Sequence, residues 1–108
     1  MTTNQDVMTK DMAALQKHAK DAANLLKTLG NEHRLLVLCT LMNSELSVGE
    51  LNDMIPLSQS SLSQHLASLR KAGLVQTRRE SQTIYYRLCG DEAIRIISVL
   101  QSIYCPDL

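Results

Sequence analysis

The chain of 108 residues contains no tryptophan or phenylalanine, and Tyr85, Tyr86 and Tyr104 are its only tyrosines. Proteins that bind single-stranded nucleic acid stack bases on several exposed rings, so this mode of binding is disfavoured, whereas recognition of a duplex is not. The sequence has no run of about 18 apolar residues, and the opening MTTNQD lacks the basic and then apolar pattern of a signal peptide. We therefore expect a cytoplasmic protein without a membrane partner.

Cysteine is also scarce. Cys39, Cys89 and Cys105 are odd in number and stand far apart, which fits neither the disulfide framework of a secreted protein nor paired CxxC zinc ligands. We expect them to begin as free thiols. None has a resolving cysteine nearby in sequence, which disfavours a thiol enzyme. The sequence thus predicts no enzyme, no catalytic residues and no cofactor.

The length and composition indicate one folded domain over residues 1–108. Domains usually run about 100 to 150 residues, and an apolar fraction of 44% with 20% charged residues is ordinary globular usage rather than that of a disordered chain. A domain this small buries a modest share of its surface, so a symmetric partner is a natural source of further burial. We expect a homodimer.

Apolar residues spaced alternately by four and three predict a long first helix. They are Met8, Met12, Leu15, Ala19, Ala22, Leu26 and Leu29. This stripe either packs on the core of its own chain or also pairs with its copy in a dimer. Gly30 and Asn31 are expected to close the helix with a left-handed cap.

Four more helices and a hairpin follow. A second helix is predicted over 35–42, a third from Ser47, whose spacing to Glu50 is that of a capping box, and a fourth from about 58 to 72, ended by Gly73. The β-rich stretches 75–79 and 83–88 form a hairpin around 80–82. Residues 90–92 are expected to cap a last helix that stops before Pro106. The predicted fold is mainly α, with five helices and a hairpin between the fourth and fifth.

The fourth helix has an unusual exposed face. Its apolar face carries Leu62, Leu66 and Leu69, and the other face is polar without being acidic. Side chains with short hydroxyls and amides lower helix propensity, and they gain little unless they contact a binding partner. The alternative interpretation is a face that is merely solvated. We favour direct contact with bases or nearby phosphates. The candidates are Gln59, Ser60, Ser63, Gln64 and His65.

The net charge is zero, so any attraction to nucleic acid depends on how the charges are distributed. Residues 58–90 hold five basic residues, Arg70, Lys71, Arg78, Arg79 and Arg87, against one acid, Glu80. A polar helix followed by a basic hairpin would place phosphate-binding charge beside a helix that contacts bases. We therefore take Arg70, Arg78, Arg79 and Arg87 as candidates for phosphate or minor-groove contact. The alternative is a basic surface without a partner.

Several stretches resemble the arsenic-repressor (ArsR/SmtB) family of small dimeric transcription factors. Residues 57–75, LSQSSLSQHLASLRKAGLV, are similar to its recognition helix and exit turn; residues 26–35, LKTLGNEHRL, are similar to the junction before its second helix, and 85–88, YYRL, to its second wing strand. The likeness spans roughly residues 20–105. It implies a winged helix-turn-helix, paired as a homodimer through the first and last helices, that binds double-stranded DNA at an imperfect palindrome.

The metal motifs of that family are absent from the matching positions. Where arsenic sensors carry Cys-x-Cys, this chain has Ser47 and Gly49, and the last helix, where zinc sensors place ligands, contains no histidine over 91–104. His18, His33 and His65 lie on three different segments, and a lone histidine is more often structural than a ligand. We expect no metal, and a metal-responsive repressor is the less favoured alternative.

Cys39 and Cys105 make the chain similar to the redox- and sulfide-responsive branch of the family. The resemblance implies a switch in which oxidation or persulfidation links these two residues and changes operator affinity. Alternatively Cys39 is only a small buried hydrophobe, and the protein acts constitutively by competing with a silencing protein. Cys89 is interpreted as structural. The wing tip, residues 80–82, lacks the glycine common there.

Overall fold

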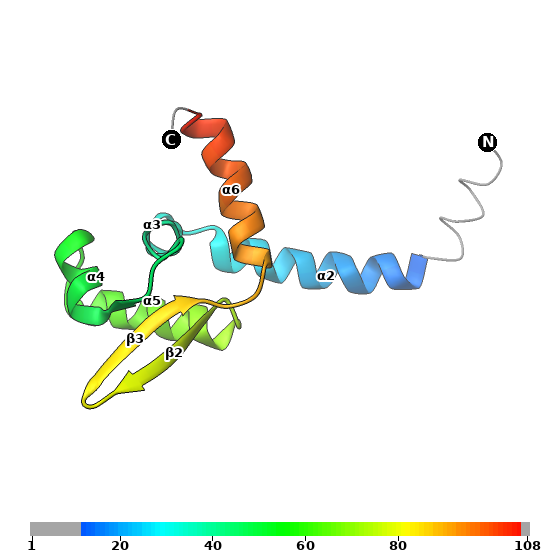
Figure 1. Ribbon diagram of the computed structural model, residues 1–108. Coiled ribbons are helices and arrows are strands. Elements are labelled where there is room, and N and C mark those ends of the chain that lie inside the picture. Colours follow the sequence, from blue (N-terminus) through cyan, green and yellow to red (C-terminus); the bar gives the residue numbers. More distant parts are fainter. Residues whose placement is uncertain (1–11, 107–108) are drawn as a thin grey trace.

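The computed structural model describes residues 12–106, which form five helices and a small antiparallel sheet (Figure 1). In chain order the elements are α2 (Met12–Leu29), α3 (Glu32–Thr40), β1 (Leu46–Ser47), α4 (Val48–Met54), α5 (Gln59–Lys71), β2 (Val75–Glu80), β3 (Thr83–Leu88) and α6 (Glu92–Tyr104). The predicted fold class is confirmed, with the hairpin between α5 and α6. Met8, which we placed in the first helix, lies outside the described residues.

Both ends of α5 are fixed by local signals in the sequence. At its start the Ser58 hydroxyl accepts a hydrogen bond from the Ser61 amide at 3.2 Å, as N-cap serines do. At its end Gly73 has a φ of 76°; its amide donates to Arg70 and the Leu74 amide donates to Leu69, both at 3.0 Å. This pair of bonds is a Schellman motif, so the predicted role of Gly73 is confirmed.

Gly73→Ala is expected to lower the free energy of unfolding by about 1 kcal/mol, because the left-handed region disfavours any residue with a Cβ. The cost is conformational, since an added Cβ would meet no atom within 4 Å. Gly49→Ala in α4 is the matched control, and it should raise stability by about 0.5–1 kcal/mol through helix propensity. Urea unfolding of the two variants measures both changes, and effects of the same sign would contradict this account.

The sheet has three strands in the order β1-β3-β2. β2 and β3 pair from Val75↔Leu88 at the base to Glu80↔Thr83 at the tip, where Ser81 takes the positive φ of 58° that the two-residue loop needs without a glycine. β1 pairs with β3 through Leu46↔Tyr86. We predicted only the hairpin and missed β1, because two residues are too few to show an alternating pattern.

Two predicted helix caps differ from the structure. Gly30 does not adopt the left-handed conformation that we expected; Gly73 and Gly90 are the described glycines with a positive φ. Instead the Asn31 amide bonds to the Leu29 carbonyl at 2.8 Å, and Asn31 is extended and caps the start of α3. A Cβ on Gly30 would lie 3.2 Å from the Leu26 carbonyl oxygen.

At α6, Asp91 is helical in conformation and its side chain makes no capping bond. The capping box of Ser47 and Glu50 is confirmed at α4.

The core lies between α3, α4, α5, the base of the sheet and one side of α6, and α2 extends away from it (Figure 1). Of the predicted apolar stripe from Met12 onward, only Leu29 is buried, and Leu26 is 60% exposed. On α6, Ala93 and Ile97 are buried while Ile103 is 61% exposed. Packing on the chain's own core therefore accounts for only the end of the α2 stripe.

Candidate nucleic-acid interface and cysteine groove

The exposed face of α5 offers neutral hydrogen-bonding groups to the solvent. Leu62, Leu66 and Leu69 are fully buried, and this orientation leaves the opposite face open. Four of the predicted contact residues, Gln59, Ser60, Ser63 and Gln64, are exposed there together with Ala67. Ser60 lies at the N-terminal end, with its hydroxyl 3.3 Å from that of Ser58. The face thus combines hydroxyls, amides and a methyl group, which are the groups that contact base edges in a major groove.

A groove of about 420 Å³ separates this face from the sheet. On the α5 side it is lined by Ser63, Leu66, Ala67, Arg70 and Lys71, and on the sheet side by Tyr86. The lining includes two cations and no acid. The structure thus places Arg70 beside the polar face of α5, where an anionic ligand would be attracted.

His65 does not share this face. It is half-buried on the flank of α5 that packs against α3, and its ring centroid lies 5.7 Å from that of His33. Burial, and after it the positive charge of Arg34 and the neighbouring His33, hold the pKa of His65 below its usual value. Its surroundings therefore favour a neutral ring packed between two helices over the base contact we predicted.

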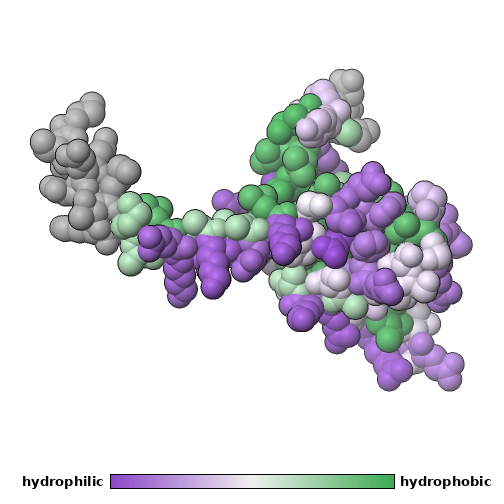
Figure 2. All heavy atoms as spheres, turned by 180° about the vertical axis from the view of Figure 1, so that it is seen from behind, coloured by the Kyte–Doolittle hydropathy of each residue, from purple (hydrophilic) through white to green (hydrophobic). Residues whose placement is uncertain are grey.

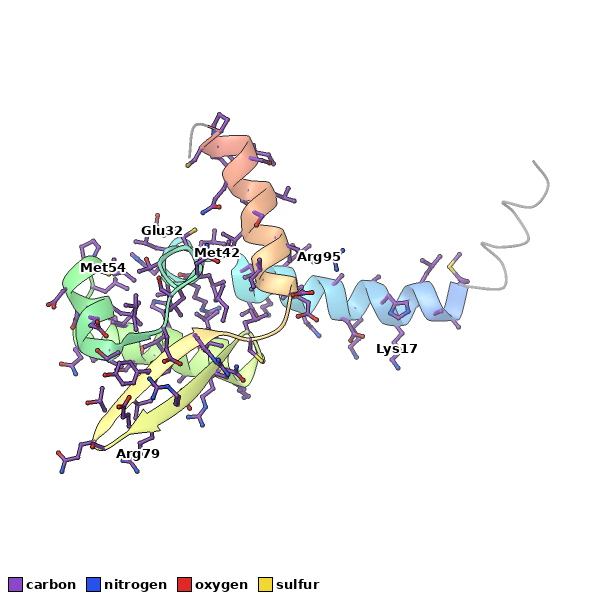
Figure 3. All side chains as sticks on the ribbon, viewed as in Figure 1. Lys17, Glu32, Met42, Met54, Arg79 and Arg95 are labelled. Atoms are coloured by element: carbon purple, nitrogen blue, oxygen red, sulfur yellow. The ribbon has the colours of Figure 1, made fainter. Side chains whose placement is uncertain are left out.

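The wing presents its side chains on two faces, because successive residues of a strand point in opposite directions. Arg78 pairs with Tyr85, and Arg79 pairs with Ile84. Arg79 therefore lies on the same face as Tyr86, the face that meets α5, and it projects near the tip of the wing (Figure 3). It is exposed, and within residues 12–106 no ion pair or side-chain hydrogen bond engages it.

Arg78 lies on the other face, and its guanidinium is bonded to side chains of the same chain. Its Nη2 is 2.7 Å from Glu45 Oε1, to which Nε donates at 2.9 Å, and its Nη1 donates to Glu80 Oε2 at 2.9 Å. Its guanidinium carbon lies 4.8 Å from the centre of the Tyr85 ring, within the range of a cation–π contact. The hydrogen bond from Arg78, reinforced by its charge, lowers the pKa of Glu45, so Glu45 is a carboxylate at neutral pH.

Arg87 shares the face of Arg78. Arg87 Nε and Nη2 donate hydrogen bonds to the Gln76 side-chain oxygen at 2.7 and 2.8 Å when the Gln76 amide is turned so that its oxygen faces them. The predicted set of wing arginines therefore divides into Arg79, whose guanidinium has no partner in the described part of the chain, and two whose guanidinium groups already have partners. We missed Glu45 entirely, because it lies 33 residues from Arg78 and no sequence pattern connects them.

Cys39 and Cys105 line a single apolar groove of about 430 Å³ between α3 and the end of α6. The other lining residues are Leu35, Ile97, Leu100, Gln101 and Tyr104. Cys39 is half-buried, and Cys105 is exposed and ends α6. Burial raises the pKa of the Cys39 thiol, and the neighbouring Cys105 raises it further. Cys89 lies outside this groove, half-buried at the end of β3, with its amide bonded to the Leu74 carbonyl at 2.9 Å.

Within the described part of the chain, no three His, Cys, Asp or Glu side chains gather as they would around a metal ion. Nor is any helix of residues 12–106 sufficiently long and apolar to span a membrane. The prediction that no metal is bound stays a prediction. A helix with a polar exposed face is followed by a wing whose Arg79 is unpaired among residues 12–106. This arrangement defines a winged helix-turn-helix DNA-binding regulator.

Comparison with known proteins assigns the family. Residues 31–77 match the model of the bacterial regulatory protein, arsR family. The chain is 48% identical over 95 residues to the transcriptional activator HlyU of Vibrio cholerae, covering 88% of each chain, and 46% identical over 100 residues to a biofilm growth-associated repressor of Agrobacterium fabrum, covering 93% of this chain and 86% of the repressor. The protein belongs to the ArsR family of transcription regulators, which are not enzymes.

Similarity to solved structures supports the same family assignment. Reduced HlyU from Vibrio cholerae superposes with a TM-score of 0.81 at 50% identity, covering 85% of this chain and 97% of that one. A homodimeric winged helix-turn-helix DNA-binding domain from Mycobacterium bovis gives a TM-score of 0.72 at 30% identity, covering 86% and 83%. The predicted resemblance to the ArsR family is confirmed.

Proposed function

We propose that this protein is a homodimeric, cytoplasmic DNA-binding regulator over residues 1–108, whose operator affinity is switched by a covalent link between Cys39 and Cys105. The observation that carries the switch is the shared groove, which places two thiols from α3 and α6 on one apolar wall although they are 66 positions apart. The relatives named as a transcriptional activator and a repressor support the regulatory role.

The dimer is supported by the apolar surface that the single chain leaves uncovered. Hydrophobic side chains cover one side of α6 and continue along one edge of α2, whereas hydrophilic residues occupy the opposite edge of α2 (Figure 2). An apolar groove of about 450 Å³ joins the two helices through Leu25, Ile96, Val99 and Leu100. A second copy of the chain fits this surface because a two-fold interface joins identical patches. The homodimeric relative from Mycobacterium bovis is consistent with it.

Such a dimer presents two copies of α5 to successive major grooves, about 34–36 Å apart, so the operator is an imperfect palindrome. Gln59, Ser60, Ser63 and Gln64 contact bases, and Arg70 and Arg79 contact phosphates or the minor groove. The partners found for Arg78, Arg87 and His65 favour indirect roles for these three residues.

The switch converts two thiols into one bridge. With a peroxide, one thiol becomes a sulfenic acid with release of water, and the second thiol displaces water from it to form the disulfide. With a persulfide donor, one thiol attacks the outer sulfur and the donor leaves as a thiol; the second thiol then attacks the inner sulfur of the new persulfide, forming the disulfide and releasing hydrogen sulfide. The exposed Cys105 reacts first, because Cys39 is half-buried with a raised pKa.

The test is fluorescence anisotropy on a duplex from the region upstream of the protein's own gene, here called the upstream duplex. Reduced protein is compared with protein treated with a persulfide donor. Tight binding that is lost on treatment and regained with reductant is the expected result. Tight binding indifferent to treatment would favour the alternative, a constitutive regulator with structural cysteines.

Two substitutions separate sequence recognition from phosphate binding. Gln64→Ala is expected to weaken binding to the upstream duplex and leave binding to a scrambled duplex unchanged, since a base contact is lost. Arg79→Ala should weaken binding to both and reduce the slope of log affinity against log salt by about one. Equal losses on both duplexes for Gln64→Ala would argue against a contact with bases.

A further inference from the structure

The most extensive polar contact on the sheet is the one made by Arg78. Glu45 immediately precedes β1 at one edge of the three-stranded sheet, and Arg78 lies on β2 at the other edge. The guanidinium therefore reaches across β3, over the Tyr85 ring, to bond Glu45 through two of its nitrogens. The side chain of Glu45 keeps 28% of its exposure and that of Arg78 keeps 47%.

The position of Glu45 determines what this contact connects. β1 leads directly into α4, and α4 and α5 form the helix-turn-helix. β1 itself holds the sheet through only two residues. The bridge from Glu45 to Arg78 thus adds a side-chain link between the segment that starts the helix-turn-helix and the far strand of the wing. Glu80, bonded to the same guanidinium at 2.9 Å, extends the link toward the tip.

The charges argue against a simple phosphate contact by Arg78. Two carboxylates already neutralise the guanidinium, and a carboxylate beside DNA repels the phosphates. Arg79 has no such partner within residues 12–106, and it lies on the sheet face that meets α5. The arrangement keeps Arg79 as the free cation and uses Arg78 to hold the strand that carries it.

We propose that Glu45 and Arg78 are positioning residues for DNA binding, and that their bridge fixes the orientation of the wing relative to α5. This inference rests on the proposed DNA interface. Glu45 contributes to affinity although its own charge opposes DNA.

Glu45→Gln gives opposite results under the two interpretations. If the bridge positions the wing, affinity for both the upstream and a scrambled duplex falls by about two- to tenfold, and the salt slope becomes shallower by up to about one because Arg79 loses its phosphate. If Glu45 only competes for Arg78 or repels DNA, affinity rises and the slope steepens. Tighter or unchanged binding would overturn the proposal.

Arg78→Lys provides the second variant, because lysine keeps the positive charge but not the fork of donors that holds both carboxylates. We expect it to bind DNA as weakly as Arg78→Gln, and full affinity would overturn the proposal. In the Arg78→Gln background, Glu45→Gln should have no further effect, since the two residues act through one contact. An undiminished effect of Glu45→Gln there would also overturn it.

Asp53→Asn is the matched control for loss of an acid. Asp53 is exposed on α4, and within residues 12–106 it makes no ion pair, so its replacement should leave affinity unchanged or slightly raised. A loss equal to that of Glu45→Gln would overturn the proposal. Failure of the wild-type protein to bind either duplex at low salt would instead refute the proposed function itself, so the two failures are distinguishable.

Discussion

Cys39→Ser is expected to bind the upstream duplex within about twofold of the reduced wild-type protein and to lose the response to a persulfide donor. Cys39 lies in the groove on α3, away from the exposed face of α5, so serine should not disturb the DNA interface. Once the Cys39 sulfur is removed, Cys105 has no second thiol in the groove with which to form a bridge. Treatment of the wild type should reduce affinity about 5- to 150-fold, the usual range of allosteric coupling. Anisotropy titrations before and after treatment measure both effects.

Cys89→Ser is the control, because Cys89 is also half-buried but lies at the end of β3, outside the groove. It should keep the full response. Mass spectrometry of the treated protein should find Cys39 and Cys105 in one cross-linked species. A normal response from Cys39→Ser, or equal loss of response from both variants, would discard the proposed bridge.

The elements that the sequence predicted well are those with local signals. The limits of α5 depend on Ser58 and Gly73, each acting within a few residues through hydrogen bonds that any serine cap or glycine end would make. The polar face of the same helix could be assigned because its leucines must be buried. Periodicity and capping therefore predicted α5 and most of its exposed residues.

The parts that the sequence could not predict depend on distant contacts. Glu45 neutralises Arg78 across the sheet, so counting charges over residues 58–90 overstated the free positive charge of the wing. His65 is turned toward His33 because α3 packs on that flank of α5. Gly30 was misjudged for another reason: glycine also serves where a Cβ would come close to neighbouring backbone atoms, and a Cβ on Gly30 would lie 3.2 Å from the carbonyl oxygen of Leu26 in the last turn of α2.

The proximity of Cys39 and Cys105 could be predicted only in part from the sequence. Nothing in the spacing of Cys39 and Cys105 brings them together, and the resemblance alone suggested a pair. The packing of α3 against α6 places both on one groove, and the apolar lining explains why burial raises the pKa of the Cys39 thiol. The direction of this pKa shift depends on the fold and could not be predicted from composition.

Ile103→Glu is expected to convert the proposed dimer to a monomer and to lower affinity for the upstream duplex by about two to four orders of magnitude. Ile103 is 61% exposed on the apolar flank of α6, and a two-fold axis would bury two glutamates together without partners. A monomer keeps one copy of α5 and loses the gain from binding two half-sites at once. Sedimentation and anisotropy measure the two losses, and circular dichroism establishes that the helices persist.

Ser98→Glu places the same charge on the opposite, polar flank of α6, where Ser98 is exposed, and should leave both the dimer and DNA binding intact. Leu26→Glu, at a site on α2 that is 60% exposed, should reproduce the effect of Ile103→Glu, because the apolar surface of Figure 2 is continuous over both helices. If Ile103→Glu and Leu26→Glu both sediment as dimers and bind with wild-type affinity, α2 and α6 do not form the interface. A partner other than a second copy of the chain would then have to cover the apolar surface of α2 and α6.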